Sequence, residues 1–214
     1  MLRNLKTLGL TVVAAMALGS VATSTASAAP QFHFESEHTI ITGTQTEAVA
    51  LAFDTGQLKC GVVNFAGTSQ VLTTTTITLN PTFDNCKLIH GAEETAATVT
   101  LNGCSFLFHL GANTEHLTGT MGIECPDFPI EIHAPECTIT VPQQGNLGTV
   151  TFTNEGAETT RSVVLDLGLG GLDYVEHGAG CASETETTNN GTLTGKITIT
   201  GENTMGAHRG IWVA

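Results

Sequence analysis

The sequence predicts an all-β protein, a single antiparallel β-sandwich domain stapled by disulfides. Short segments in which apolar and polar residues alternate recur along the chain, and this is the period of a strand with one buried face. No stretch beyond residue 28 holds apolar residues at helical spacing for three turns. Six cysteines follow a segment typical of export. We therefore expect roughly ten to twelve short strands and almost no helix.

Residues 1–28 are predicted to be a secretory signal peptide. Arg3 and Lys6 precede an apolar run over Leu8–Leu18, and Ala26-Ser27-Ala28 supplies a cleavage site. The apolar run is too short for a membrane anchor, and no later segment is apolar enough to cross a bilayer. We expect a mature chain of residues 29–214 that is secreted and has no membrane span.

The six cysteines are expected to form three disulfides, because all of them lie in the exported part and their number is even. Six cysteines allow fifteen pairings. We predict the pairs Cys60 with Cys86, Cys125 with Cys137, and Cys104 with Cys181. A zinc site is a weaker alternative, since no C-x-x-C occurs and the thiols are spread over the domain.

The mature chain is strongly acidic. Removing residues 1–28 takes away two basic residues and no acid, so the net charge changes from −13 to −15. Such a surface repels nucleic acid and anionic lipid, which argues against both as partners. The acids could instead collect cations, but solubility is the simpler explanation of their number.

The segment Leu117–Val141 is the clearest part of the pattern. Its alternation returns three times, over 117–125, 130–133 and 137–141, which predicts three short antiparallel strands. Three of the chain's six prolines interrupt this segment and a fourth, Pro142, follows it directly. Since proline cannot donate to a ladder, we expect the middle strand at an edge or a corner, which Cys125 and Cys137 would staple.

Other strands follow from the same alternation. They are expected over Phe32–Ile41, Ala48–Phe53, Gln57–Phe65, Val71–Leu79, Thr149–Thr153 and Val163–Leu169. Within the third, Leu58, Cys60 and Val62 share one face. Asn80-Pro81 should end the fourth in a turn, which places Cys86 in a loop.

The chain contains one internal echo. Residues 98–106 and 166–174 each resemble a strand broken at a glycine, and each is followed by a strand that opens Leu-Thr-Gly, at 117 and at 193. Two bent hairpins could thus pair as equivalent parts of a sandwich. Chance similarity between strands rich in threonine and glycine is an equally good explanation.

The C-terminal part holds a polar loop and the only tryptophan. The loop over 178–191 is expected to be exposed and ends in a glycosylation sequon at Asn190. In the last strand, Trp212 lies opposite in phase to Ile211 and Val213. We expect its ring to plug the core rather than to form a sugar platform.

Two groups of residues could hold a metal ion. His33 and His38 flank Glu35 and Glu37, and Glu131 shares a strand face with His133. Neither spacing matches a metal motif such as H-E-x-x-H. A solvated strand surface is the better explanation of both groups, so we expect no metal or other cofactor.

No catalytic motif occurs in the chain. There is no Gly-x-Ser-x-Gly elbow, and disulfide formation would leave no thiolate nucleophile. Glycoside hydrolysis needs two carboxylates that face each other across a cleft. The loop residues Glu93, Glu94, Glu184 and Glu186 are the candidates, although solvation explains them as well.

One resemblance covers nearly the whole mature chain. FHFESEHTIITGTQ after the signal, ECPDFPIEIHAPECTITVPQQ in the middle, GTLTGKITITG and the terminal GIWV resemble a set of uncharacterised exported β-rich proteins of actinobacteria. The resemblance implies export and a compact disulfide-linked β domain. It implies no activity and no site residue.

We therefore expect an exported, non-enzymatic β-sandwich protein that acts by binding or structural interaction at or outside the cell surface. A surface polymer or a protein would be its partner. The alternative is a carbohydrate-active enzyme on the same scaffold. Buried carboxylates facing each other across a cleft would favour the enzyme, whereas scattered exposed acids would favour binding.

Overall fold

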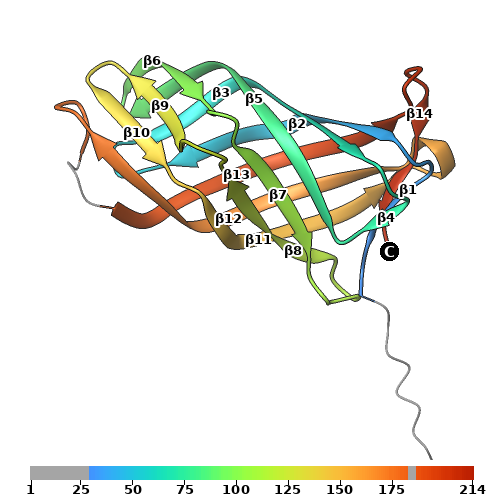
Figure 1. The fold of residues 1–214 in the computed structure, drawn as a ribbon. Helices are drawn as coiled ribbons and strands as arrows, with labels where there is room; N and C mark the ends of the chain where they lie inside the picture. The colour runs from blue at the N-terminus through green and yellow to red at the C-terminus, as the bar shows by residue number, and fades with distance from the viewer. Residues whose placement is uncertain (1–28, 183–186) are drawn as a thin grey trace, which may run out of the picture.

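A computed structural model describes residues 29–182 and 187–214, which form fifteen strands and one turn of 3-10 helix, η1 (Figure 1). The predicted signal peptide, residues 1–28, lies outside the described residues. In chain order the elements are β1 (Phe32–Phe34), β2 (Thr39–Ala52), β3 (Gln57–Ser69), β4 (Thr73–Thr74), β5 (Thr76–His90), β6 (Glu93–Thr100), β7 (Ser105–Leu110), β8 (Thr118–Glu124), β9 (Ile130–Ala134), β10 (Cys137–Val141), β11 (Gln144–Glu155), η1 (Glu158–Thr160), β12 (Ser162–His177), β13 (Thr187–Glu202), β14 (His208–Arg209) and β15 (Ile211–Val213).

The predicted all-β class is confirmed, with antiparallel strands packed face to face in a sandwich-like arrangement. Twelve strands form one large sheet, and β15, β1 and β4 form a small one. Additional pairings join β13 to β12 and β5 to β7. The path β13-β2-β3-β5-β7-β8-β11-β12 therefore returns to β13, and the two layers are joined by hydrogen bonds at both edges.

The long strands β5 and β12 each change partner midway. The N-terminal part of β5 (76–79) pairs with β7, and its C-terminal part (86–90) pairs with β6. Likewise β12 pairs first with β11 and then, over 175–177, with β10. The strands β6, β9 and β10 thus fill the space between β5 and β12 at one end of the molecule (Figure 1).

This change of partner explains why the predicted turn at Asn80-Pro81 is wrong. Pro81 lies within β5, opposite Phe65 of β3, and Cys86 lies in the same strand rather than in a loop. Over residues 80–85, β5 pairs with β3 and has no ladder partner on its other side among the described residues. A proline is tolerated there because its missing N–H leaves no ladder bond unmade.

The inner faces of the sheet enclose one hydrophobic core. Burial of each large side chain contributes about 1.5–3 kcal/mol to folding. The largest fully buried side chains are those of Tyr174, Phe32, Phe108, Ile41, Leu58, Leu79, Met121, Ile132, Ile139, Leu165, Leu169 and Leu172.

The first and last strands close one end of this core. In β1 and β15, Phe32 and Val213 are directly paired and buried. The side chain of Asn154 on β11 holds the last strand by two hydrogen bonds of 2.8 Å. Its amide nitrogen donates to the Val213 carbonyl, and its oxygen accepts from the Val213 N–H. We call this end of the molecule, where the first and last strands lie, the terminal end. The opposite end, where the β5–β6 and β9–β10 hairpins lie, is called the loop end (Figure 1).

Two expectations about strand position are wrong. The middle strand of the central segment, β9, is not at an edge, because it lies between β6 and β10 and the prolines fall outside it. In β3, Val62 is 41% exposed while Val63 is fully buried. The residues that point inward change from even to odd positions along β3, because the ladder kinks where Gly61 faces Asn85, which has a φ of 55°.

The internal echo has a partial counterpart in the fold. Its second copy is the β12–β13 hairpin, whose pairing is irregular around Gly171, a residue with a φ of 75°. In the first copy, Gly103 lies in a turn that separates β6 from β7, so that segment is two strands. The β7–β8 and β12–β13 hairpins do not pair with each other, because β11 lies between β8 and β12.

All six cysteines form disulfides, in the pairs Cys60–Cys86, Cys104–Cys125 and Cys137–Cys181. The first pair is as predicted, since its members are directly opposite on β3 and β5. The predicted pairs Cys125–Cys137 and Cys104–Cys181 are wrong.

The strand pairings explain both errors. In the β7–β8 hairpin Ser105 pairs with Glu124, so the next residues outward, Cys104 and Cys125, meet at its open end. Cys137 begins β10, which pairs with the last residues of β12. It therefore lies beside the segment that follows β12, where Cys181 is found.

Candidate functional site

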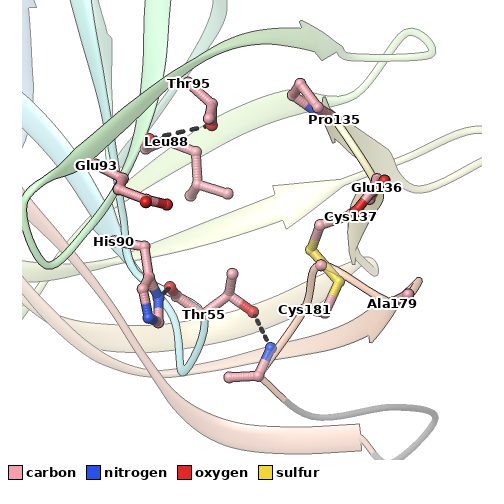
Figure 2. A pocket seen from close by; sticks show the side chains of 12 residues that line it. Thr55, Leu88, His90, Glu93, Thr95, Pro135, Glu136, Cys137, Ala179 and Cys181 are labelled. Atoms are coloured by element: carbon pink, nitrogen blue, oxygen red, sulfur yellow. Dashed lines mark hydrogen bonds between the residues drawn. A yellow bond between two sulfur atoms is a disulfide. The ribbon is translucent and has the colours of Figure 1, made fainter.

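A cleft with a volume of about 550 Å³ lies at the loop end. Four segments build it: the β2–β3 turn, the β5–β6 turn, the β9–β10 turn and the residues after β12 (Figure 2). We call it the loop-end cleft. The residues that line it are Thr55, Leu88, His90, Glu93, Thr95, Pro135, Glu136, Cys137, Ala179, Gly180, Cys181 and Ala182.

Covalent and hydrogen bonds hold the walls of the cleft together. The Cys137–Cys181 disulfide joins the β9–β10 turn to the segment after β12. The buried Thr55 joins three elements: its hydroxyl accepts from the Ala182 N–H at 2.7 Å, and its carbonyl bonds the His90 ring. Its N–H donates to a carboxylate oxygen of Glu176 at 2.9 Å. The cleft is therefore largely preformed.

A second network of hydrogen bonds joins the β2–β3 turn to β12 and β13. The Asp54 N–H donates to the Tyr174 hydroxyl, which donates to the Asn190 side-chain oxygen. The Asn190 amide nitrogen donates to an Asp54 carboxylate oxygen, and all three bonds measure 2.8 Å. The side-chain nitrogen of Asn190, to which a glycan at the predicted sequon would be attached, is therefore engaged in this cycle.

Tyr174 gives a direct test of that network, because it is the only tyrosine in the chain. Burial raises its pKa above the usual value of a tyrosine, about 10. The folded protein then keeps the phenol proton at a pH where the unfolded chain has lost it, so stability should fall as the pH rises above about 10. We expect phenolate absorbance to appear in the folded protein only above that pH.

The matched variant for this titration is Tyr174→Phe. Both proteins keep Lys196, whose pKa is raised by its hydrogen bond to Glu47 and which also titrates at high pH. The variant should lose about 1–2 kcal/mol at neutral pH, because the Asp54 N–H loses its acceptor. If the phenolate of the native protein formed at the usual pKa of tyrosine, the claim that burial raises the pKa of Tyr174 would be contradicted.

The ionisable groups of the cleft lie at its rim. His90 and Glu93 project from one side and Glu136 lies on the other (Figure 2), and all three are exposed. Of the acids predicted as catalytic candidates, Glu93 is the one among the described residues that lines the cleft. Glu94 bonds Lys87 at 2.7 Å, and this hydrogen bond lowers the pKa of Glu94. Glu184 and Glu186 lie outside the described residues.

The two predicted metal groups are arranged differently from each other. His33 stacks on Trp212, Glu35 accepts from the Gly210 N–H, and His38 bonds Gln70, so the first group is not brought together. Glu131 and His133 do meet, at 3.2 Å, on the exposed face of β9. No cluster of three or more histidine, cysteine or acidic side chains suited to a metal ion occurs within residues 29–182 and 187–214.

The prediction that Trp212 plugs the core is wrong. Ile211 and Val213 are buried, whereas the tryptophan between them is half-buried on the outer side of β15. Its ring stacks on His33, with ring centroids 5.3 Å apart, and the Arg161 guanidinium lies 4.9 Å from the centre of the ring. These contacts cover part of the surface that a sugar would need.

Most of the cleft carries no signal in the sequence. Asp54-Thr55-Gly56 and the segment around Pro135-Glu136 carry ordinary turn residues, and nothing in their spacing links them to His90 or Cys181. The one usable signal was the loop acid Glu93, which lines the cleft. The turns that form the cleft converge because β5 and β12 change ladder partner.

The one helical element among the described residues is the three-residue η1, so no helix there is long and apolar enough to cross a membrane. No protein-family model matches the chain, and searches of curated proteins and of solved structures found no significant match. The function must therefore be argued from the geometry of the chain itself.

Proposed function

We propose that this chain is an exported binding protein that holds a surface polymer or a protein segment in its loop-end cleft, outside the cell. The observation that carries the proposal is the braced cleft itself. Its volume of about 550 Å³ lies within the roughly 300–1,000 Å³ typical of ligand sites. A disulfide and the bonds of Thr55 keep its walls in place without a ligand, which reduces the entropy cost of binding.

Export is supported by the sequence and by the bonded cysteines. Three intramolecular disulfides are typical of proteins from oxidising compartments. The N-terminal segment has the composition of a signal peptide. Cleavage after Ala28 and the resemblance to exported actinobacterial proteins stay predictions, and N-terminal sequencing of the secreted product would test the first.

The chemistry of the rim suggests the kind of ligand. Glu93 and Glu136 offer carboxylate oxygens, which accept hydrogen bonds from hydroxyl and ammonium groups. Leu88 and Pro135 supply apolar surface between them. A hydroxyl-rich polymer or a peptide with basic side chains fits this surface, whereas a polyanion would be repelled by the net charge of −15 expected after cleavage.

Exposure of the rim acids favours binding over the alternative of a carbohydrate-active enzyme. A glycosidase needs one carboxyl group that stays protonated at its working pH, and burial is the usual way to achieve this. Glu93 and Glu136 are both exposed, and the buried Glu176 accepts the Thr55 N–H behind the cleft wall.

The first test is the melting temperature of the oxidised protein with neutral polysaccharides, basic peptides, divalent metals and EDTA. A ligand at about a hundred times its Kd adds roughly 2.7 kcal/mol, which is a shift of several degrees at this size. We expect a shift with a polysaccharide or a basic peptide. The double variant Glu93→Gln and Glu136→Gln should lose most of it.

Glu115→Gln is the matched control, because Glu115 is an exposed acid in the β7–β8 turn, away from the cleft. It should leave the ligand-induced shift unchanged. Equal shifts in the double variant and the wild type, or no shift with any compound, would contradict binding in the cleft. Release of reducing sugar from a polysaccharide would instead support the enzyme.

A further inference from the structure

A smaller pocket lies at the terminal end, opposite the loop-end cleft. It has a volume of about 150 Å³. One of its sides is formed by η1 and the start of β12, and the other by the β13–β14 hairpin. Its lining includes Arg161, Arg209, His208, Ser162 and Thr200. We call it the arginine pocket. None of the described residues that line it is acidic, although the chain has twenty aspartates and glutamates.

The two arginines of this pocket are less neutralised by carboxylates than Lys87 and Lys196 are. Lys87 and Lys196 each bond a carboxylate at 2.7 Å on the strand surface. Within the described part of the chain, no carboxylate forms an ion pair with Arg161. The nearest acid to Arg209 is Glu35, at 3.9 Å.

Glu35 is itself engaged elsewhere. One of its carboxylate oxygens accepts from the Gly210 N–H at 2.8 Å, and the other makes the long contact with Arg209. Glu202 is the cross-strand neighbour of His208, but it does not line the pocket. The acids near the pocket therefore lie behind or beside its walls.

Both guanidinium groups keep donors available for a ligand. The Arg161 side chain is held by its contact with the Trp212 ring, 4.9 Å from the ring centre, and this contact consumes no N–H donor. Arg209 makes one long hydrogen bond of 3.4 Å to the His208 carbonyl. Each arginine has five N–H donors, so most of them remain free to bind an oxyanion.

The backbone around the two arginines is tightly fixed. The Ile211 N–H donates to the Arg161 carbonyl at 3.1 Å, and Arg209 pairs with Gly201 across the β13–β14 hairpin. At Gly210 the chain passes so close to η1 that a Cβ would lie 2.6 Å from the Glu158 carbonyl oxygen. The two side chains are thus presented from a rigid frame, which favours a specific site over a diffuse patch.

We propose that the arginine pocket binds a single small oxyanion group: a phosphate, a sulfate or a carboxylate. Two guanidinium forks and the neighbouring hydroxyl side chains match the acceptor oxygens of such a group. A volume of about 150 Å³ is below the range of drug-sized sites and suits one small group. The acidic remainder of the surface disfavours a polyanion. This proposal is independent of the loop-end cleft.

The test is an NMR titration of the oxidised, ¹⁵N-labelled protein with inorganic phosphate, sulfate or acetate, at constant ionic strength in potassium chloride. We expect saturable shifts of the Gly201 and Arg209 amides. Arg161→Gln and Arg209→Gln should each weaken binding by about tenfold or more. Arg161→Lys, which keeps the charge but loses the fork, should weaken it to an intermediate extent.

Lys59→Gln is the matched control, because it removes the same charge from an exposed position on β3. It should change the affinity less than about twofold. The anion with the lowest Kd then distinguishes a phosphate, a sulfate and a carboxylate as the source. Shifts that stay linear up to high anion concentration, or equal weakening by Lys59→Gln and Arg209→Gln, would overturn the proposal. Arg209→Gln decides the matter if Arg161→Gln perturbs the Trp212 contact and the fold.

Discussion

Replacing Cys137 and Cys181 together by alanine is expected to lower the free energy of unfolding by about 4 kcal/mol. The disulfide closes a loop of 44 residues, and the chain-entropy treatment gives a cost of this size for the freedom that the unfolded chain regains. The same change should loosen the loop-end cleft, because the bond joins the β9–β10 turn to one cleft wall. Urea denaturation measures the first effect, and hydrogen exchange at residues 179–182 measures the second.

Replacing Cys104 and Cys125 by alanine is the matched control. That disulfide closes a 21-residue loop at the open end of the β7–β8 hairpin, so the expected loss is similar, about 3 kcal/mol. It should leave exchange at the cleft unchanged once global stability is taken into account. Equal effects of the two double variants on the cleft would contradict the bracing role of Cys137–Cys181.

Gly119→Ala is expected to destabilise the protein by about 3 kcal/mol or more, because the position has no room for a side chain. A Cβ at Gly119 would lie 1.8 Å from the His109 carbonyl oxygen and 3.0 Å from the Phe152 ring. The first of these atoms belongs to the backbone of the paired strand β7, which cannot move without breaking the hairpin ladder. The midpoint and slope of urea unfolding would measure the loss.

Gly170→Ala is the control for this substitution. Gly170 also lies in a strand, β12, but a Cβ there would meet no atom within 4 Å. Alanine restricts the unfolded chain more than glycine does, so the variant should be unchanged or more stable by about 0.5 kcal/mol. A Gly119→Ala protein as stable as Gly170→Ala would show that β7 and β8 do not approach as closely as described.

Local alternation was the most reliable guide to the strands. It located the segments that became β8, β9 and β10: β9 and β10 bury every second residue, and β8 buries Met121 and Ile123. Alternation was wrong at Val62, where the strand kinks, since a shift of one residue exchanges the inner and outer faces. The turn signal at Asn80-Pro81 was wrong because β5 continues through it.

The candidate site was much less predictable than the strands. Glu93 was singled out as a loop acid, but its neighbours across the loop-end cleft were not. Thr55 and Glu136 lie 81 residues apart in sequence (136 − 55), and only the pairing of β5 with β6 and of β10 with β12 brings their turns together. At the other end, Arg161 and Arg209 line one pocket because β13 pairs with both β12 and β14.

The correctly predicted pair Cys60–Cys86 meets because β3 pairs with β5, a long-range contact. The sequence by itself determined the all-β class and the acidic composition. These follow from the chain's local periodicity and residue types, which act without knowledge of distant partners. Only the tertiary structure decided which cysteines meet in the other two disulfides, which turns form the loop-end cleft, and that Trp212 lies outside the core. Each of these depends on which strands become neighbours. The cleft and the Cys137–Cys181 bond follow from the way β5 and β12 divide their hydrogen bonds between two partners. The Cys104–Cys125 bond follows from the β7–β8 hairpin, and the position of Trp212 from the pairing of β15 with β1.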